Sequence, residues 1–392
     1  MTADHDGQLH VVYTGLTEDG HYGQAYLAEG GGRDWTTEAV PLGTTERIPS
    51  IAFDSDDSIH IANIGGGYTE YYNLRYVTDA DGTWESRTFE FGANVLTARI
   101  AVDSTDSPLI LTVVRSYESP DEVISIGMAG EEGVESDVYS LDEGWHFVSV
   151  SSIAADGDGR LHAILVRTET GSSWTADHLV FDSGAWTVSE GPDLGEGEPH
   201  FSHQSLAIDD AGDIHLTFSQ DIGDGAVAMY AVERDGVWIC ETVGETGNYF
   251  LSPSIALDST GTPHVAFMHA IDSSTEGTGY AVRVNGEWTY TEVDDRSPAF
   301  WSACSMVIDS NDGIHLCTGL PHDSGSSFDA AYITDSEPGL LTMDWITEAA
   351  LVTALVATLV CIPTAAALHL WDKKRRKREE LTAMGLHDGA LK

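Results

Sequence analysis

The chain has 392 residues, of which 64 are Asp or Glu and 18 are Lys or Arg, so its formal net charge at pH 7 is -46. Such a negative surface argues against the binding of nucleic acid, because its phosphates are also negatively charged. A protein tolerates this charge where salt screens the repulsion between its own carboxylates, as in halophile proteins. A hydrophobic content of 42% in ordered strand patterns argues against a disordered chain.

A single pattern recurs seven times along the chain. It reads Ile or Leu, Ala, an apolar residue and Asp, then two residues, Gly or Asp, two more residues, and His before further apolar residues, as at 51–62. Successive copies lie about fifty residues apart, a spacing typical of four-stranded propeller blades. The aspartates of the seven copies are Asp4, Asp54, Asp103, Asp156, Asp209, Asp258 and Asp309.

Each repeat predicts four antiparallel strands. An apolar run such as 255–257 fits a strand that is buried on both faces, and the Asp and Gly residues after it favour a tight hairpin turn. A second strand begins at the His, as at 264–267, and a third follows at 280–283. A turn before Trp288 opens a fourth strand. We therefore predict an all-β fold, a seven-bladed β-propeller of four-stranded antiparallel blades over residues 1–335.

The two ends of this ectodomain depart from the repeat. Met1 stands where other repeats carry the Ile or Leu of the innermost strand, so we expect the first blade to be truncated at the amino end. No secretory signal is encoded there. We expect a missing upstream segment to supply both the signal and the rest of the first blade. In the seventh repeat, little room is left for a fourth strand, and we assign residues 336–348 to a juxtamembrane linker.

Residues 349–371 form an uncharged apolar segment that is long enough to cross a bilayer as a helix, although a buried core helix has the same composition. The basic run 373–378 follows it directly, so the positive-inside rule places the tail 372–392 in the cytoplasm. The sequence thus predicts a single-pass protein of the cell membrane, with the propeller outside and the membrane contacted through the carboxy-terminal helix.

Six repeats carry a matched histidine, and the third repeat has Leu109 instead. Metal binding and catalysis are open interpretations, but equivalent positions in different blades are too far apart to share one ion, so we expect each histidine to bond its backbone or the turn aspartate. Asp-rich turns such as 309–313 resemble the start of calcium loops without the distal Glu, which leaves calcium as the one possible cofactor. The matched histidines are His10, His60, His162, His215, His264 and His315.

The four cysteines do not form a disulfide framework. Cys304 and Cys317 fall on adjacent predicted strands, where one bridge is possible outside the cell. Cys240 and Cys361 have no evident partner, and the latter lies within the apolar segment.

The loops between second and third strands, and those between one repeat and the next, are long, irregular and rich in aromatic residues, and both sets lie at one end of a propeller. Aromatic rings beside polar groups suit the recognition of sugars or peptides, although such rings also pack under their own loops. The candidate binding residues are Tyr68, Tyr71, Tyr72, Trp174, His200, His203, Tyr249, Trp301 and His322. No catalytic residue is assigned, because the acidic candidates Glu70, Asp177, Glu198 and Asp221 are too numerous to choose from.

Two family resemblances bear on the fold and function. The motif of 253–264, followed by Tyr280-Ala281 and Gly286-Glu287-Trp288, resembles uncharacterised prokaryotic surface propellers, and the acidic composition resembles that of proteins from salt-loving archaea. The string 47–49, Arg-Ile-Pro, is similar to one in the sialidase-like superfamily, where it supplies an arginine of a carboxylate-binding triad. The Ser-x-Asp-x-Gly-x-Thr-Trp box of that superfamily is missing.

These observations favour a membrane-anchored extracellular propeller that binds a carbohydrate or a surface protein through its variable loops, without chemistry of its own. A sialidase-like glycoside hydrolase or a polysaccharide lyase is the alternative, and a non-catalytic surface-layer scaffold is the second alternative.

Overall fold

The structure of the protein is a computed structural model that describes residues 1–345 except 17–21, 32–33, 45–48, 66–71, 92, 116–121, 131–132, 142–143, 170, 172, 224, 247–251, 273–274, 295–303, 322–327 and 338–339. The apolar segment 349–371 and the basic tail lie outside the described residues. Among the residues described, none belongs to a helix of the length and apolarity that a membrane span requires.

The described strands form seven antiparallel sheets, which we number in chain order. Sheets one to three contain β1 (Thr2–Ala3), β2 (Leu9–Leu16), β3 (Tyr22–Gly31) and β4 (Asp34–Thr44); β5 (Ser50–Phe53), β6 (Ile59–Gly65), β7 (Asn73–Thr78) and β8 (Glu85–Phe89); and β9 (Asn94–Val102), β10 (Pro108–Arg115), β11 (Glu122–Gly130) and β12 (Gly133–Ser140). Sheets four and five contain β13 (His146–Val150), β14 (Ala154–Ala155), β15 (Leu161–Thr168), β16 (Thr175–Asp182) and β17 (Ala185–Glu190); and β18 (Pro199–His200), β19 (Leu206–Ile208), β20 (Ile214–Asp221), β21 (Ala226–Arg234) and β22 (Val237–Thr246). Sheets six and seven contain β23 (Ser254–Leu257), β24 (Pro263–Asp272), β25 (Thr275–Val284) and β26 (Glu287–Asp294); and β27 (Ser305–Ile308), β28 (Ile314–Pro321), β29 (Phe328–Glu337) and β30 (Leu340–Trp345).

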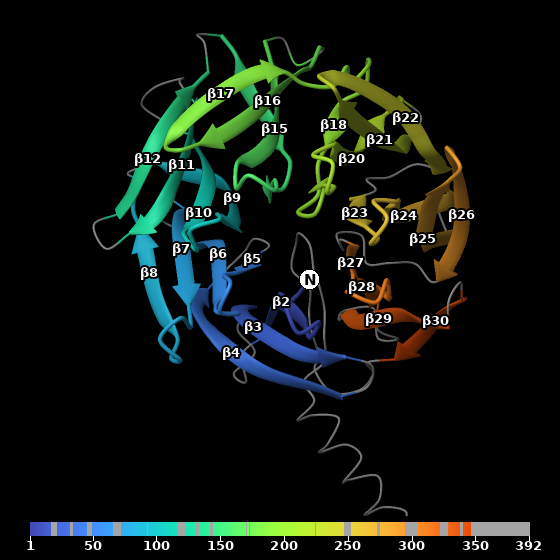
Figure 1. Cartoon of the computed structure of the whole chain (residues 1–392), viewed down its shortest axis with the longest axis horizontal. Helices are drawn as coiled ribbons and strands as arrows, with labels where there is room; N and C mark the ends of the chain where they lie inside the picture. The colour runs from blue at the N-terminus through green and yellow to red at the C-terminus, as the bar shows by residue number, and fades with distance from the viewer. Residues whose placement is uncertain are drawn as a thin grey trace, which may run out of the picture.

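The sheets stand around a common centre, with the first strand of each innermost and the fourth on the rim (Figure 1). The seventh sheet contacts the first, because the rings of Trp35 on β4 and Tyr332 on β29 meet edge to face with centroids 5.4 Å apart. The prediction of an all-β chain built from repeated antiparallel sheets is confirmed.

The seventh sheet differs from the expectation in its last strand. We expected little room for a fourth strand, but β30 pairs with β29 and completes the sheet. It lies in the range 336–348 that the sequence analysis assigned to a linker. At the other end of the chain, β1 supplies the innermost strand of sheet one with two residues.

The conserved spacing of Asp and His within each repeat is explained by the hairpin between the first and second strands. In sheet two, Oδ1 of Asp54 accepts the backbone N–H groups of Asp56 (3.0 Å) and Ser58 (2.8 Å). Asp57 takes a left-handed φ of 62°, which Asp, Asn and Gly tolerate best. Oδ2 of Asp54 faces Nε2 of His60 at 3.3 Å, so one carboxylate holds both the turn and the start of the next strand.

The same Asp–His contact recurs in all six repeats that have the histidine, at 2.8 to 3.4 Å between Oδ2 and Nε2. In four of them, Nδ1 of the histidine is bonded to a tyrosine hydroxyl of the third strand. These tyrosines are Tyr76, Tyr230, Tyr280 and Tyr332. Each matched histidine therefore makes its hydrogen bonds within its own sheet, as we expected from the sequence.

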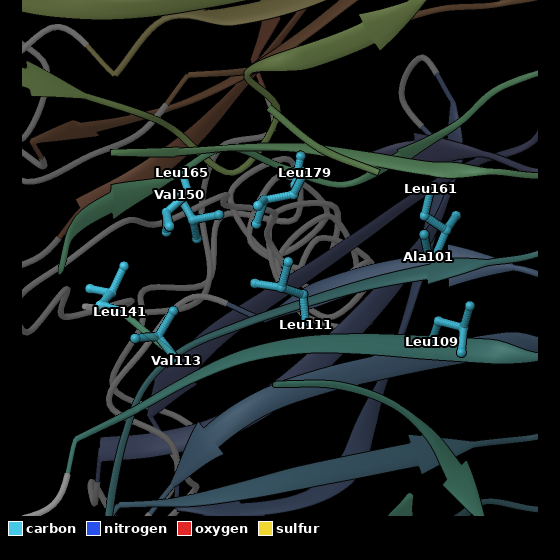
Figure 2. Packing of buried hydrophobic residues seen from close by; sticks show 10 residues of the cluster. Ala101, Leu109, Leu111, Val113, Leu141, Val150, Leu161, Leu165 and Leu179 are labelled. Carbon is cyan, nitrogen blue, oxygen red and sulfur yellow. The ribbon is translucent and has the colours of Figure 1, made fainter. Parts of the chain in front are cut away.

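Apolar side chains fill the space between neighbouring sheets. Figure 2 shows the cluster between sheets three and four, in which Leu109, Leu111 and Val113 of β10 face Leu161 and Leu165 of β15. Similar clusters lie between sheets one and two, two and three, four and five, five and six, and six and seven. A single four-stranded sheet cannot bury both of its faces, so this packing stabilises each sheet only when it stands in the ring.

Candidate functional site

Four of the predicted binding residues lie in the described part of the structure. Tyr72 and Trp174 are both half-buried, the first packed against the cluster between sheets two and three and the second against the cluster between sheets four and five. His200 and His203 are also half-buried and lie on the innermost segment of sheet five. The other five predicted residues, Tyr68, Tyr71, Tyr249, Trp301 and His322, lie outside the described residues.

His200 lies beside two carboxylates at the end of sheet five where the long loops connect the strands, which we call the loop face. β18 pairs with the last residues of β20, so Pro199 is opposite Gln220. This register brings the side chains of Glu198, His200 and Asp221 together, with one ligand atom of each within 4.8 Å of the others. We call these three residues the Glu–His–Asp cluster.

Backbone geometry holds this cluster in place. The N–H of Asp221 donates to the carbonyl of Glu198 at 3.1 Å. Gly197 passes so close to the opposite strand that a Cβ there would lie 1.8 Å from the carbonyl oxygen of Asp221. Only glycine permits this approach. An imidazole with two carboxylates can bind sugar hydroxyls, move a proton, or hold a divalent cation through one nitrogen and two oxygens.

Sheet four adds an aromatic and charged group on the same face. Arg167, near the end of β15, donates to both carboxylate oxygens of Asp177, at 2.5 Å from Nε and 3.1 Å from Nη2. The guanidinium carbon lies 3.9 Å from the ring centroid of Trp145. This stacked, bidentate arrangement fixes the indole and the carboxylate relative to each other.

A cavity of about 220 Å³ lies at the centre of the ring, between the innermost strands. Gln204 of sheet five bonds across it, because its side-chain oxygen accepts from Ser305 and from the backbone N–H of Met306 (3.1 Å), while its amide nitrogen donates to the carbonyl of Met1. Polar residues of sheets one, five and seven therefore meet in the cavity. His203 lies next to Gln204 and also lines the cavity.

His203 is held neutral. Burial lowers the pKa of His203 well below the ordinary value. The positive charge of Arg99 lowers the pKa further, as does the chain's terminal amine. A neutral imidazole offers one donor and one acceptor nitrogen to a ligand in the cavity.

The innermost strands are joined by serine hydroxyls that the sequence analysis did not single out. These serines stand four residues before the turn aspartate, and in three of them the hydroxyl accepts the backbone N–H of the innermost segment in the next sheet. Ser50 accepts from Ile100 at 3.2 Å, Ser152 from Leu206 at 2.9 Å, and Ser254 from Met306 at 3.1 Å. The serines at this position are Ser50, Ser152, Ser205, Ser254 and Ser305, and in the third repeat the position is held by Arg99.

Cys304 and Cys317 are both buried, and the structure does not join them in the disulfide that the sequence allows. The calcium interpretation of 309–313 also finds no support in the geometry. Oδ1 of Asp309 already accepts the N–H groups of Asn311 and Gly313, each at 2.8 Å, and Oδ2 contacts His315.

No protein-family model matches the chain, and the search of curated proteins found no relative. Several solved structures share its fold. An ulvan lyase of polysaccharide lyase family 25, bound to a GlcA–Rha3S ligand, aligns over 92% of this chain and 95% of its own with a TM-score of 0.57 and 11% identity. A protein from Lactobacillus plantarum aligns over 90% and 98% with a TM-score of 0.54 and 14% identity. An α-L-arabinanase from Penicillium chrysogenum in complex with arabinobiose aligns over 79% and 93% with a TM-score of 0.50 and 13% identity. At these identities the likeness concerns the fold alone.

Proposed function

We propose that this protein is a seven-bladed β-propeller that binds carbohydrate at the loop face of sheets four and five, and that the apolar segment 349–371 anchors it in a membrane with the propeller outside. The observation that carries the binding proposal is the Glu–His–Asp cluster. It places an imidazole and two carboxylates within 4.8 Å of one another at the surface. Such groups accept hydrogen bonds from sugar hydroxyls in several directions at once.

Aromatic side chains of sheets four and five support a sugar rather than a bare cation as the ligand. Phe201 follows His200 directly and packs with Trp174 in the cluster of apolar residues between sheets four and five. Trp145 lies on the other side of sheet four, stacked on Arg167. Rings at the edge of a polar site stack on the apolar faces of sugars.

A glycan array that is probed with the full chain in detergent at high salt tests the proposal. The array should include uronic-acid and sulfated polysaccharides, because the ulvan lyase with the same fold is bound to such a ligand. We expect Asp221→Asn to reduce the affinity for the bound glycan at least tenfold, since one buried or half-buried hydrogen-bonded carboxylate contributes roughly this much.

The matched control is Asp210→Asn. Asp210 is exposed in the hairpin turn of the same sheet, at the opposite end from the loop face, and the substitution changes the charge by the same amount. We expect it to bind like the unchanged protein. Equal losses in the two variants, or binding to no glycan, would contradict the proposed function.

A lyase or hydrolase is the second candidate, and the position of His200 favours it. An imidazole between two carboxylates is suited to removing a proton from a uronic-acid residue or to assisting the attack of water on a glycosidic bond. Any glycan found on the array should be incubated with the protein, and the products separated by chromatography. Cleavage by the unchanged protein that is lost in His200→Ala would show that the protein is an enzyme. A glycan that stays intact would leave binding as the function.

A further inference from the structure

The central cavity lies towards the loop face of the ring. Several of its lining residues are the first residues of innermost strands, as Ser50 is in β5, Leu206 in β19 and Ser305 in β27. Each of these strands runs from a long loop to a hairpin turn, so its first residue is the one nearest the loop face. A volume of about 220 Å³ corresponds to about seven water molecules at about 30 Å³ each. The cavity therefore has room for one sugar residue, although it is smaller than the pockets of about 300 Å³ and more that hold drug-sized ligands.

The lining of this cavity carries almost no charge. In the part of the chain that the structure describes, none of the lining residues is Asp, Glu, Lys or Arg, although the net charge of the chain is -46. Met1 lines the cavity, and its terminal amine donates to Oγ of Ser305 at 2.9 Å. Burial lowers the pKa of this amine to about 6, so it is mostly uncharged at neutral pH. A charged group of a ligand would lose its hydration here without gaining a counter-charge, so the lining favours a neutral ligand.

The ring of His203 lines the cavity and makes no hydrogen bond to any described residue. Other polar side chains of the lining are bonded to protein groups, and these are Ser50, Ser152, Gln204 and Ser305. The six matched histidines differ from His203 in the same way, because each contacts a turn aspartate. The side chain of His203 is half-buried and uncharged, so it presents one donor and one acceptor nitrogen without a partner among the described residues.

Branched aliphatic side chains form much of the remaining wall. They come from five different sheets and are Ile51, Ile100, Ile153, Leu206 and Ile255. Ligand pockets combine such apolar walls with a small number of polar groups that fix the orientation of the ligand. The C–H groups of a sugar ring can contact the aliphatic side chains while a hydroxyl bonds to the imidazole.

We propose that the central cavity binds a single neutral sugar residue, whose hydroxyls bond to the imidazole of His203 and whose ring packs on the surrounding isoleucines. The lining has the size, the lack of charge and the hydrogen-bonding group that such a ligand requires. This inference rests on the proposed function for the class of ligand. It deepens that function by adding a second contact region, at the centre of the ring, and by naming a neutral residue as the part of the glycan that enters it.

A purely structural role for His203 leads to a different expectation. His203→Phe keeps a planar ring at the same place and removes both nitrogens. If the ring only fills space, this variant should bind sugar as the unchanged protein does. If the nitrogens bind a ligand, the variant should lose about tenfold in affinity, the effect of one or two neutral hydrogen bonds, and should be at least as stable without ligand. His203→Gln should keep part of the affinity, because its amide has both a donor and an acceptor.

The test uses the full chain at high salt in a detergent that has no sugar head group. Saturation-transfer difference NMR detects binding of glucose, galactose, mannose, xylose, rhamnose and arabinose, and a titration gives the affinity for the sugar with the strongest signal. Glucuronate and glucosamine serve as charged probes. We expect at least one neutral sugar to bind and both charged probes to bind at least tenfold more weakly than that sugar. Thermal midpoints without sugar show whether each variant is folded.

The matched control is His146→Phe, which makes the same substitution at an exposed histidine at the start of β13. It should bind like the unchanged protein. Equal affinities of His203→Phe and the unchanged protein, equal losses in the two variants, tighter binding of a charged probe, or binding of no sugar would overturn the proposal. An array glycan whose affinity falls in Asp221→Asn and not in His203→Phe would overturn this inference and leave the proposed function intact. The reverse pattern would support this inference and contradict the proposed function, so the two failures are distinguishable.

Discussion

The turn aspartate should be the most destabilising single carboxylate to remove from a repeat, and sheet two allows a matched comparison. Asp54 and Asp56 belong to the same turn and carry the same charge. Asp54 accepts two backbone N–H groups on one oxygen and contacts His60 through the other. Asp56 is exposed and takes part in the turn through its backbone N–H.

The magnitude follows from the contacts that each variant loses. Asp54→Ala removes the acceptor of two backbone donors and leaves the imidazole of His60, which is buried, with its tyrosine contact alone. At about 1 kcal/mol for each net hydrogen bond, and somewhat more for a charged acceptor, we expect a loss of about 2 to 3 kcal/mol. Asp56→Ala should change the free energy of unfolding by less than about 0.5 kcal/mol, as surface substitutions do.

Urea unfolding, followed in parallel by tryptophan fluorescence and circular dichroism, measures the difference between the two variants. High salt should be present, because the removal of any carboxylate from so acidic a chain relieves repulsion, and Asp56→Ala reports this general effect separately. Equal midpoints for the two variants would refute the assignment of the fold's stability to the turn aspartate.

Two further predictions concern buried side chains. His178 stands where four other sheets have tyrosine, and burial together with His162 lowers its pKa to about 4. Because an unfolded histidine binds a proton below about pH 6.5, stability should fall as the pH drops from 6.5 towards 4, and His178→Tyr should reduce this loss when thermal midpoints at pH 7 and pH 5 are compared. Cys304 and Cys317 are buried, and burial raises the pKa of the Cys304 thiol. In a Cys361→Ser background, a thiol reagent should therefore label Cys240 first. Simultaneous labelling of all three cysteines in the native state would contradict the packing.

The repeat was readable from the sequence because its signals are local. An Asp that bonds the turn which follows it, and a residue such as Asp57 that accepts a left-handed φ, lie within a few residues of each other. The last strand of sheet seven was missed because β30 lacks the Gly-x-Trp turn of other repeats and stands next to the apolar segment. The local pattern therefore predicted the hairpin of each repeat but not the last strand of sheet seven.

The site was harder to predict because it depends on register between distant strands. Glu198 and Asp221 were both named as acidic candidates, but only the pairing of β18 with β20 shows that these two belong together with His200. Arg99 is visible as the exception to a serine position once the repeats are aligned.

Several departures from the repeat lie in sheets three to five. Arg99 gives up the serine bond between sheets, Leu109 gives up the histidine bond to the turn, and His178 replaces the tyrosine hydroxyl. The changes at Arg99 and Leu109 remove a hydrogen bond that other sheets use, and Leu109 returns an apolar contact in the cluster between sheets three and four. His178 keeps a bond to His162, at 3.0 Å between Nε2 and Nδ1. Positions that break a local rule without a gain for the fold are expected at functional sites. The cavity lining of sheet five and the Glu–His–Asp cluster lie on this same part of the ring, which is why we place ligand binding here rather than at sheets six or seven.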